Sequence, residues 1–307
     1  MGRFILRRIL ILIPTLLVIM TLSYALMRAA PGGPFDQEKP LPPAIRKNIE
    51  AKFHDDWPMW KQYLHYVAGV ARFDFGPTYK YADRTVNDVI AEGLPVSLEL
   101  AAVALVIALA LGLGAGLIGA VFRGRWPDKL VMATALGGLC VPNFVLAPLL
   151  ILVFALTFRL LPAARFVSAR HVILPATALG ASYVAYVARM VRAGVVETVQ
   201  LDFIRTARAK GLSERVVVTR HALPLGLLPV VSYLGPAVVG LMTGSVVIEK
   251  IFGIPGLGRY FVDAAINRDY TLSMGIVIVD ASLLLVANLV VDVVYGLLDP
   301  RVREGTK

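Results

Sequence analysis

Residues 9–27 read Ile-Leu-Ile-Leu-Ile-Pro-Thr-Leu-Leu-Val-Ile-Met-Thr-Leu-Ser-Tyr-Ala-Leu-Met, and no side chain in this run carries a charge. Its length is close to the roughly 20 apolar residues that an α-helix needs to cross the hydrocarbon core of a bilayer. A cleaved signal peptide also has basic residues in front, but its apolar region is only about 7 to 15 residues long. The run therefore predicts an uncleaved transmembrane anchor over residues 1–28.

Further apolar runs follow the anchor, over residues 94–122, 130–158, 172–196, 225–248 and 273–298. They predict an all-α integral membrane protein with about six transmembrane helices. Prolines interrupt the third, fourth and fifth spans, namely Pro142, Pro148, Pro175, Pro229 and Pro236. Membrane helices tolerate proline where neighbouring helices or water satisfy the freed backbone groups, so kinked helices around a pathway are expected.

Small residues recur at every fourth position of the second span, at Gly112, Gly116 and Ala120. This spacing lets the backbones of two membrane helices approach closely. The run of Gly112, Gly114 and Gly116 is also similar to a dinucleotide-binding fingerprint, but that fingerprint lies at a turn from strand to helix and not inside a span. Close helix packing is therefore the expected role of these residues.

The positive charges indicate the orientation, because lysine and arginine in short loops are retained on the cytoplasmic side. They gather at the amino terminus, between the second and third spans, and most densely between the fourth and fifth. With an even number of spans these segments share one side, so both termini are predicted to be cytoplasmic. The third-to-fourth connection disagrees, with Arg159, Arg165 and Arg170 on the predicted outer side, but the other segments outweigh it.

Composition and motifs exclude several other classes of protein. The net charge of +10 lies in short segments between apolar runs, whereas nucleic-acid binding needs a basic water-exposed face, so no nucleic-acid partner is predicted. The chain has no nucleotide-binding Gly-x-x-x-x-Gly-Lys-Ser/Thr loop. Its four histidines are scattered and its one cysteine, Cys140, lies in an apolar run, so no metal site and no disulfide is expected. No catalytic residues are predicted.

Residues 29–93 differ from the apolar runs in being polar, with balanced charges and several aromatic residues. They predict a small subdomain inserted on the outer side after the first span. Its proline-rich opening, residues 31–43, predicts an extended connector. Alternatively, Trp57 and Trp60 lie at the bilayer interface, where tryptophan is enriched.

The connection between the fourth and fifth spans contains, over residues 202–212, Asp-Phe-Ile-Arg-Thr-Ala-Arg-Ala-Lys-Gly-Leu. Phe203, Ile204, Ala207 and Leu212 recur at helical spacing, and Gly211 is placed to end the helix. An amphipathic helix of this kind either docks in a groove of a partner protein or lies on the membrane surface. These residues alone leave both alternatives open.

This connection resembles the cytoplasmic signature of binding-protein-dependent ABC importer permeases, which is Glu-Ala-Ala followed at fixed spacing by Gly and by Ile-x-Leu-Pro. The matched positions are Arg205, Thr206, Ala207, Gly211, His221, Leu223 and Pro224. Arg205 replaces the acidic residue and His221 the isoleucine. The form Arg-Thr-Ala-Arg-Ala-Lys-Gly is similar to the peptide, dipeptide and nickel branch of the family, as are residues 2–14, 28–34, 74–76, 86–90, 94–97, 249–258, 267–270 and 298–303. The long outer loop is most similar to the first membrane subunit of oligopeptide permeases.

The resemblance implies a channel-forming subunit of an ATP-driven oligopeptide importer, with a dipeptide or nickel-chelate importer as the alternative. It implies a permease core over residues 94–307 whose helix at about 201–212 docks on an ATPase. The coupling residues would be Phe203, Arg205, Thr206, Ala207, Ala209, Lys210, Gly211, Leu212, Leu223 and Pro224. The implied partners are a homologous second permease, two ATPases that bind ATP and Mg²⁺, an extracytoplasmic peptide-binding protein and the lipid bilayer. The chain itself would be a cofactor-free transport subunit in the inner membrane, and not an enzyme.

Four polar residues within the predicted spans are candidates for a functional role: Glu99, Asp280, Asn288 and Asp292. A charged residue at the centre of a span costs roughly 2.5 to 3.5 kcal/mol, so it usually faces a cavity or a partner. These residues either line the pathway or pair between helices, for example Asp292 with Arg189. A proton-coupled secondary transporter that uses the three carboxylates is the alternative from a different class.

Overall fold

The computed structural model describes residues 2–29, 57–81 and 83–298, and this part of the chain is helical with short connections. The helices are α1 (Gly2–Ala29), α3 (Met59–Ala71), α4 (Val86–Val121), α5 (Trp126–Cys140), α6 (Asn143–Leu150), η1 (Ile151–Thr157), α7 (Ala169–Thr198), α8 (Asp202–Ala209), α9 (Glu214–Val216), η2 (Val217–Ala222), α10 (Leu223–Gly226), α11 (Leu228–Phe252), α12 (Leu257–Ile266) and α13 (Tyr270–Leu298), of which η1 and η2 are π-helices. The predicted connector over residues 31–43 and the end of the chain from residue 299 lie outside the described residues.

Within the described part, α1, α4, α7, α11 and α13 are each long and apolar enough to cross a membrane. A sixth span results if α5 is counted together with α6 and η1, which confirms the predicted number. This sixth span is not one continuous helix, because the chain bends by 108° between α5 and the segment formed by α6 and η1. Pro142 lacks a backbone N–H and keeps Val141 extended, with ψ of 117°, so the break is much sharper than an ordinary kink.

The α4 helix begins eight residues before the predicted apolar run because polar side chains start it at Val86. The Thr85 hydroxyl accepts a hydrogen bond from the Asp88 backbone N–H (3.2 Å), and the Asp88 carboxylate accepts one from the Thr85 N–H (2.8 Å). This reciprocal capping satisfies two backbone donors that a helix start would otherwise leave unpaired.

The glycines of α4 allow it to pack closely on α7, as the sequence predicts. A Cβ atom added to Gly112 would lie 2.6 Å from the Cβ of Val187, and one added to Gly116 would lie 2.6 Å from the carbonyl oxygen of Ala188. Glycine is thus required at both crossings. The adjoining core, shared with α11, includes the fully buried residues Leu100, Leu179, Leu241 and Ile248.

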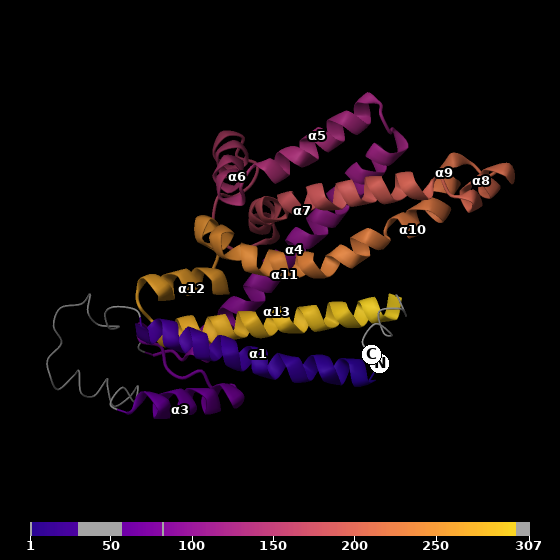
Figure 1. The fold of residues 1–307 in the computed structure, drawn as a ribbon. Coiled ribbons are helices and arrows are strands. Elements are labelled where there is room, and N and C mark those ends of the chain that lie inside the picture. The colour runs from indigo at the N-terminus through magenta and orange to yellow at the C-terminus, as the bar shows by residue number, and fades with distance from the viewer. Residues whose placement is uncertain (1, 30–56, 82, 299–307) are drawn as a thin grey trace.

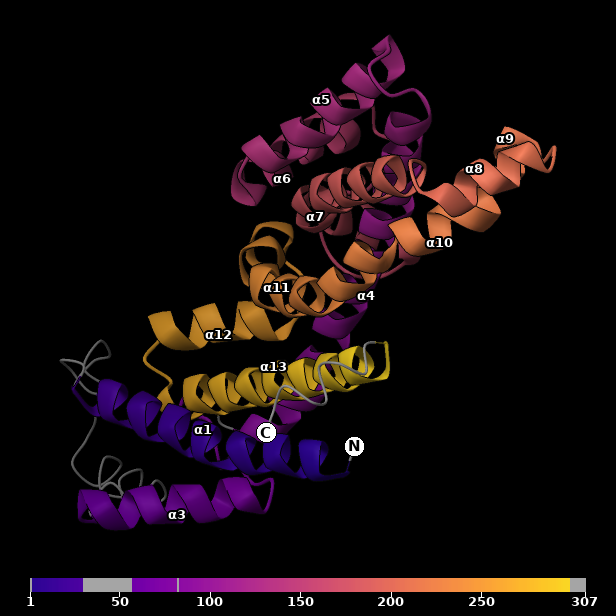
Figure 2. The ribbon, with the colours of Figure 1, turned by 45° about the vertical axis from the view of Figure 1, so that its right-hand side comes forward.

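The helices spread in layers (Figures 1 and 2). The α1 and α13 helices lie side by side on one flank, α5 and α6 lie on the opposite flank, and α4, α7 and α11 lie between them. The start of α1, the end of α13, the α4–α5 turn and α8 lie toward one end of the molecule, and α12 lies at the other end. The most basic segments of the described chain therefore share one end.

Candidate functional site

The α8 helix is anchored to the rest of the chain by two apolar side chains. Ile204 is fully buried and Ala207 is 5% exposed. They pack in an apolar cluster with residues of α7, η2 and α11, namely Val187, Val191, Val195, Val217, Ala222 and Val230. Phe203 and Leu212 do not join this cluster and remain 44% and 39% exposed. The predicted apolar face is thus divided between a buried contact and a free surface.

The carboxyl end of α8 is fixed by a turn and an ion pair. Gly211 adopts a left-handed conformation with φ of 78°, which confirms that the helix ends there. The Arg208 guanidinium donates two hydrogen bonds to the Glu214 carboxylate, at 2.7 and 3.2 Å. This bidentate pair raises the pKa of Arg208 and lowers the pKa of Glu214. It holds α9 against the end of α8.

The other predicted coupling residues are likewise divided between exposed positions and contact with the apolar cluster. Arg205, Thr206, Ala209, Lys210 and Gly211 are exposed, and Arg205 makes only a 3.3 Å ion pair with Asp202 of the same helix. In α10, Pro224 is exposed, while Leu223 packs against the cluster that holds α8. Both views show α8 and α9 protruding beyond the ends of α1 and α13 (Figures 1 and 2). The structure therefore brings these residues together as one protruding, mostly exposed unit.

A buried carboxylate, Glu249, organises the opposite end of the molecule. It is fully buried, and it accepts hydrogen bonds from the Ser97 hydroxyl (2.7 Å) and the Arg259 backbone N–H (3.1 Å). Ser97 in turn accepts a hydrogen bond from the Leu257 backbone N–H (2.9 Å). Because these N–H groups open α12, Glu249 and Ser97 together cap that helix from α11 and α4. A Cβ at Gly256 would lie 2.4 Å from the Glu249 carboxylate, so glycine is needed there.

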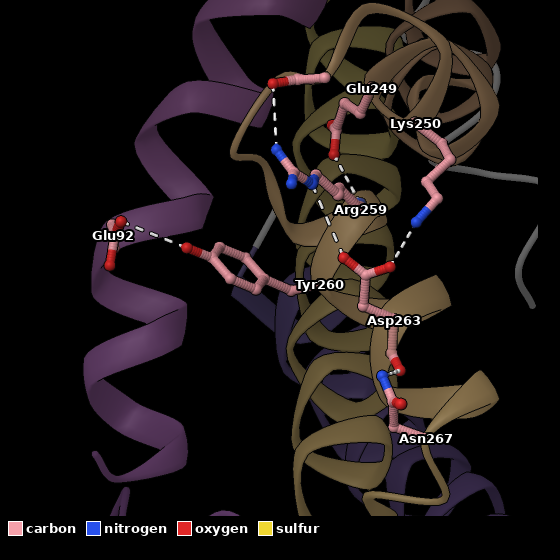
Figure 3. A network of polar contacts seen from close by, with 8 residues as sticks. Glu92, Glu249, Lys250, Arg259, Tyr260, Asp263 and Asn267 are labelled. Atoms are coloured by element: carbon pink, nitrogen blue, oxygen red, sulfur yellow. Dashed lines mark hydrogen bonds and ion pairs between the residues drawn. The ribbon is translucent and has the colours of Figure 1, made fainter. Parts of the chain in front are cut away.

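Ion pairs at the surface extend this junction (Figure 3). Asp263 pairs with Lys250 of α11, and its carboxylate lies 3.6 Å from Arg259 on the preceding turn of α12. The Tyr260 hydroxyl donates a hydrogen bond to Glu92 of α4 at 3.2 Å. Three helices, α4, α11 and α12, are therefore joined by polar contacts. We name this group the α12 junction, made of Ser97, Glu249, Leu257, Arg259, Tyr260, Asp263, Glu92 and Lys250.

The polar residues predicted within the spans lie in different surroundings. Glu99 and Asn288 are exposed. Asp280 lines a cavity of about 10 Å³ with Ser97 and Ser245, which has room for at most one water molecule. Asp292 belongs to α13, but its side chain lies outside the described residues, so its pairing with Arg189 stays a prediction.

Sequence reasoning assigned no role to Glu249 or to a second buried carboxylate, Asp128. Asp128 is 3% exposed and joins α5 to α7 by a bidentate ion pair with Arg192, at 2.6 and 2.7 Å. Its partner is distant in sequence, so no local pattern shows the contact. For Glu249 a signal was present, since an acidic residue precedes a glycine-rich turn and a helix start, and carboxylates favour helix amino termini.

The fold is that of a polytopic membrane subunit with no nucleotide-binding loop of its own. Residues 89–304 match the family described as binding-protein-dependent transport system inner membrane component, and the chain belongs to this family. It is thus a multi-pass inner-membrane permease subunit of an ABC importer.

Two relatives match along the whole chain. The chain is 47% identical over 306 residues to the oligopeptide transport system permease protein OppB of Salmonella typhimurium, covering 99% of this chain and 100% of that relative. It is 44% identical over 307 residues to the dipeptide transport system permease protein DppB of Bacillus subtilis, covering 100% of both chains. A structure described as "Crystal structure of an amino acid ABC transporter with histidines" shares the fold, with a TM-score of 0.53 at 20% identity over 70% of this chain and 94% of that chain.

Proposed function

We propose that this subunit forms the channel of an ATP-driven importer for oligopeptides and that α8 is the helix through which ATPase subunits act on it. The names of the two full-length relatives support a peptide as cargo. A dipeptide or a nickel chelate is the alternative cargo. The ATPases would bind ATP and Mg²⁺, a second homologous permease would pair with this one, and an extracytoplasmic binding protein would deliver the peptide.

The observation that carries the coupling role is the division of the α8 side chains. Ile204 and Ala207 attach the helix to its own chain, and Phe203 and Leu212 stay exposed on a protruding unit. An exposed aromatic residue on a short helix, with an exposed leucine three residues beyond its end, fits the helix-in-groove mode of recognition. The protrusion of α8 favours docking on a protein over attachment to the bilayer surface.

The attachment of α8 explains how a push on it would reach the pathway. The cluster that holds Ile204 contains residues of α7 and α11, so a displacement of α8 acts on two spans at once. Such a push changes the equilibrium between outward-open and inward-open states only if the ATPase holds α8 differently in the two states. We further propose that both termini and α8 face the cytoplasm and that residues 29–93 lie on the outer side.

The test replaces both exposed apolar residues, Phe203→Ala with Leu212→Ala, in the assembled transporter. Truncating residues at the centre of an interface typically costs more than about 1 kcal/mol each, so ATP-dependent peptide uptake into vesicles is expected to fall about tenfold or more. Phe158→Ala is the matched control, because Phe158 is 62% exposed and lies outside α8. Unchanged uptake with unchanged abundance of the double variant would contradict the proposal.

A further inference from the structure

The α3 helix lies beside the first span and not above it. Both views show it alongside the half of α1 that is farther from the amino terminus (Figures 1 and 2). The Tyr63 hydroxyl of α3 lies 2.7 Å from the Thr21 hydroxyl, and the rings of Tyr63 and Tyr24 are 5.5 Å apart. Thr21 and Tyr24 belong to the apolar span of α1, which covers Leu10–Ala29. These contacts place α3 at the depth of the membrane-crossing part of α1.

One face of α3 is apolar and uncovered. Trp60, Leu64, Ala68 and Ala71 are all exposed and follow one another at helical spacing. Trp60 is 66% exposed and Leu64 is 56% exposed. We name these four residues the α3 stripe. No charged residue interrupts it, which is unusual for a helix that faces water.

The polar side chains of α3 point elsewhere. His65, Arg72 and the following Asp74 line a cavity of about 300 Å³ between α3, α1 and α13. Lys61, one turn from the start of the helix, lies with its ammonium group 3.9 Å from the centre of the Trp57 ring. The polar groups are thus gathered near the cavity and the first turn of α3. Of the α3 stripe, Ala68 borders this cavity, whereas Trp60, Leu64 and Ala71 do not line it.

The first span offers the same kind of surface. Leu22 and Leu26 of α1 are 57% and 70% exposed, and they follow Thr21 and Tyr24, which contact Tyr63 of α3. A membrane-crossing helix keeps such residues exposed because acyl chains cover them. Beyond α3, Phe73 is 79% exposed and holds a strained left-handed backbone with φ of 59°. Exposed apolar side chains are therefore found on α1, on α3 and directly beyond the carboxyl end of α3.

We propose that α3 is immersed in the outer leaflet of the bilayer as a half-span, with the α3 stripe in contact with lipid acyl chains. The occupant of this surface is lipid and not a protein partner, because α3 contacts the membrane-crossing part of α1 and therefore lies at the depth of the acyl chains. The assignment to the outer leaflet rests on the proposed cytoplasmic placement of the termini. The immersion itself does not depend on α8 or on the cargo.

The experiment uses the complete transporter in proteoliposomes and a nitroxide spin label on single cysteines. Cys140 is exposed and is first replaced by serine. Labels at Leu64→Cys and Ala71→Cys are compared with Leu22→Cys as the lipid reference and with Asp83→Cys, an exposed loop position, as the water reference. The measured quantity is relaxation by oxygen, which concentrates in the bilayer, relative to relaxation by a water-soluble nickel chelate.

The ratio of oxygen to nickel-chelate relaxation at positions 64 and 71 is expected to match that at position 22 and to exceed that at position 83 several-fold. A ratio equal to that at position 83 would show that α3 stands in water and would overturn the proposal. An immobile label that neither reagent reaches would show that a protein surface covers the stripe, which would also overturn it. Two label positions keep the test decisive if one variant fails to fold. Uptake by the same variants reports on the coupling role and leaves the depth measurement unaffected.

Discussion

The helices at the two ends of this subunit are fixed by different kinds of interaction. At the α12 junction, the buried Glu249 carboxylate of α11 accepts one hydrogen bond from Ser97 of α4 and one from the start of α12, which it caps. At the other end, α8 is attached by the buried side chains of Ile204 and Ala207 and by a partly exposed ion pair. The first arrangement resists small displacements because buried donors lose their partners as soon as the helices separate.

The difference indicates that the helices at the two ends of the subunit differ in how easily they can shift. Apolar contacts tolerate sliding better than a buried hydrogen-bond network, because they have no fixed direction. We therefore expect the contact between α8 and α7 to adjust while it passes a push on to both spans, and we expect α4, α11 and α12 to move together. The predictions below test this contrast, beginning with the largest expected effect.

The largest loss of stability is expected from Glu249→Ala. The substitution leaves the Arg259 N–H and the Ser97 hydroxyl without their buried acceptor, and each unsatisfied group costs about 1 to 3 kcal/mol. The free energy of unfolding in a detergent titration should fall by about 2 to 6 kcal/mol. Glu99→Ala is the control on α4, since Glu99 is exposed, and it should change the value little. Equal effects of the two substitutions would show that the α12 junction does not stabilise the fold.

A smaller and local effect is expected from Ile204→Val. Removing one methylene from a fully buried isoleucine costs about 0.5 to 1.5 kcal/mol. Since this residue attaches α8, hydrogen exchange of the α8 amides should become faster, while exchange in α12 stays the same. Faster exchange in both helices would mean that the two ends are not independent.

The smallest effect is expected for the ion pair between Arg208 and Glu214. The side chains are 38% and 66% exposed, so a double-mutant cycle with alanine should give about 0.2 to 1 kcal/mol. Because the pair lowers the pKa of Glu214, its contribution is present in full above the ordinary glutamate pKa of about 4.3 and is lost as the pH falls through the lowered pKa. The coupling energy from the cycle, measured by hydrogen exchange of the α8 amides, should therefore fall toward zero in acid. A coupling energy that grows in acid would contradict the assignment.

The fold could be predicted from the sequence better than the individual side-chain contacts could. Apolar length predicted the spans, and the spacing of Gly112 and Gly116 predicted their packing, because both are local patterns. The sharp break at Pro142 was expected only as a kink, since the bend depends on how α6 packs. The roles of Ile204 and Phe203 could not be separated, because the neighbours that bury one of them come from α7 and α11. Glu249 was missed as a capping residue for the same reason, as Ser97 lies in a distant segment.

The most direct measurement of the central claim is photo-crosslinking from position 203. A photoreactive phenylalanine analogue replaces Phe203 in the complete transporter, and Phe158 carries the same analogue as a control. The account predicts an adduct between position 203 and an ATPase subunit whose yield changes with bound nucleotide, and no such adduct from position 158. Adducts from position 203 to lipid alone, with the ATPase subunits present and active, would contradict the role of α8 as the coupling helix.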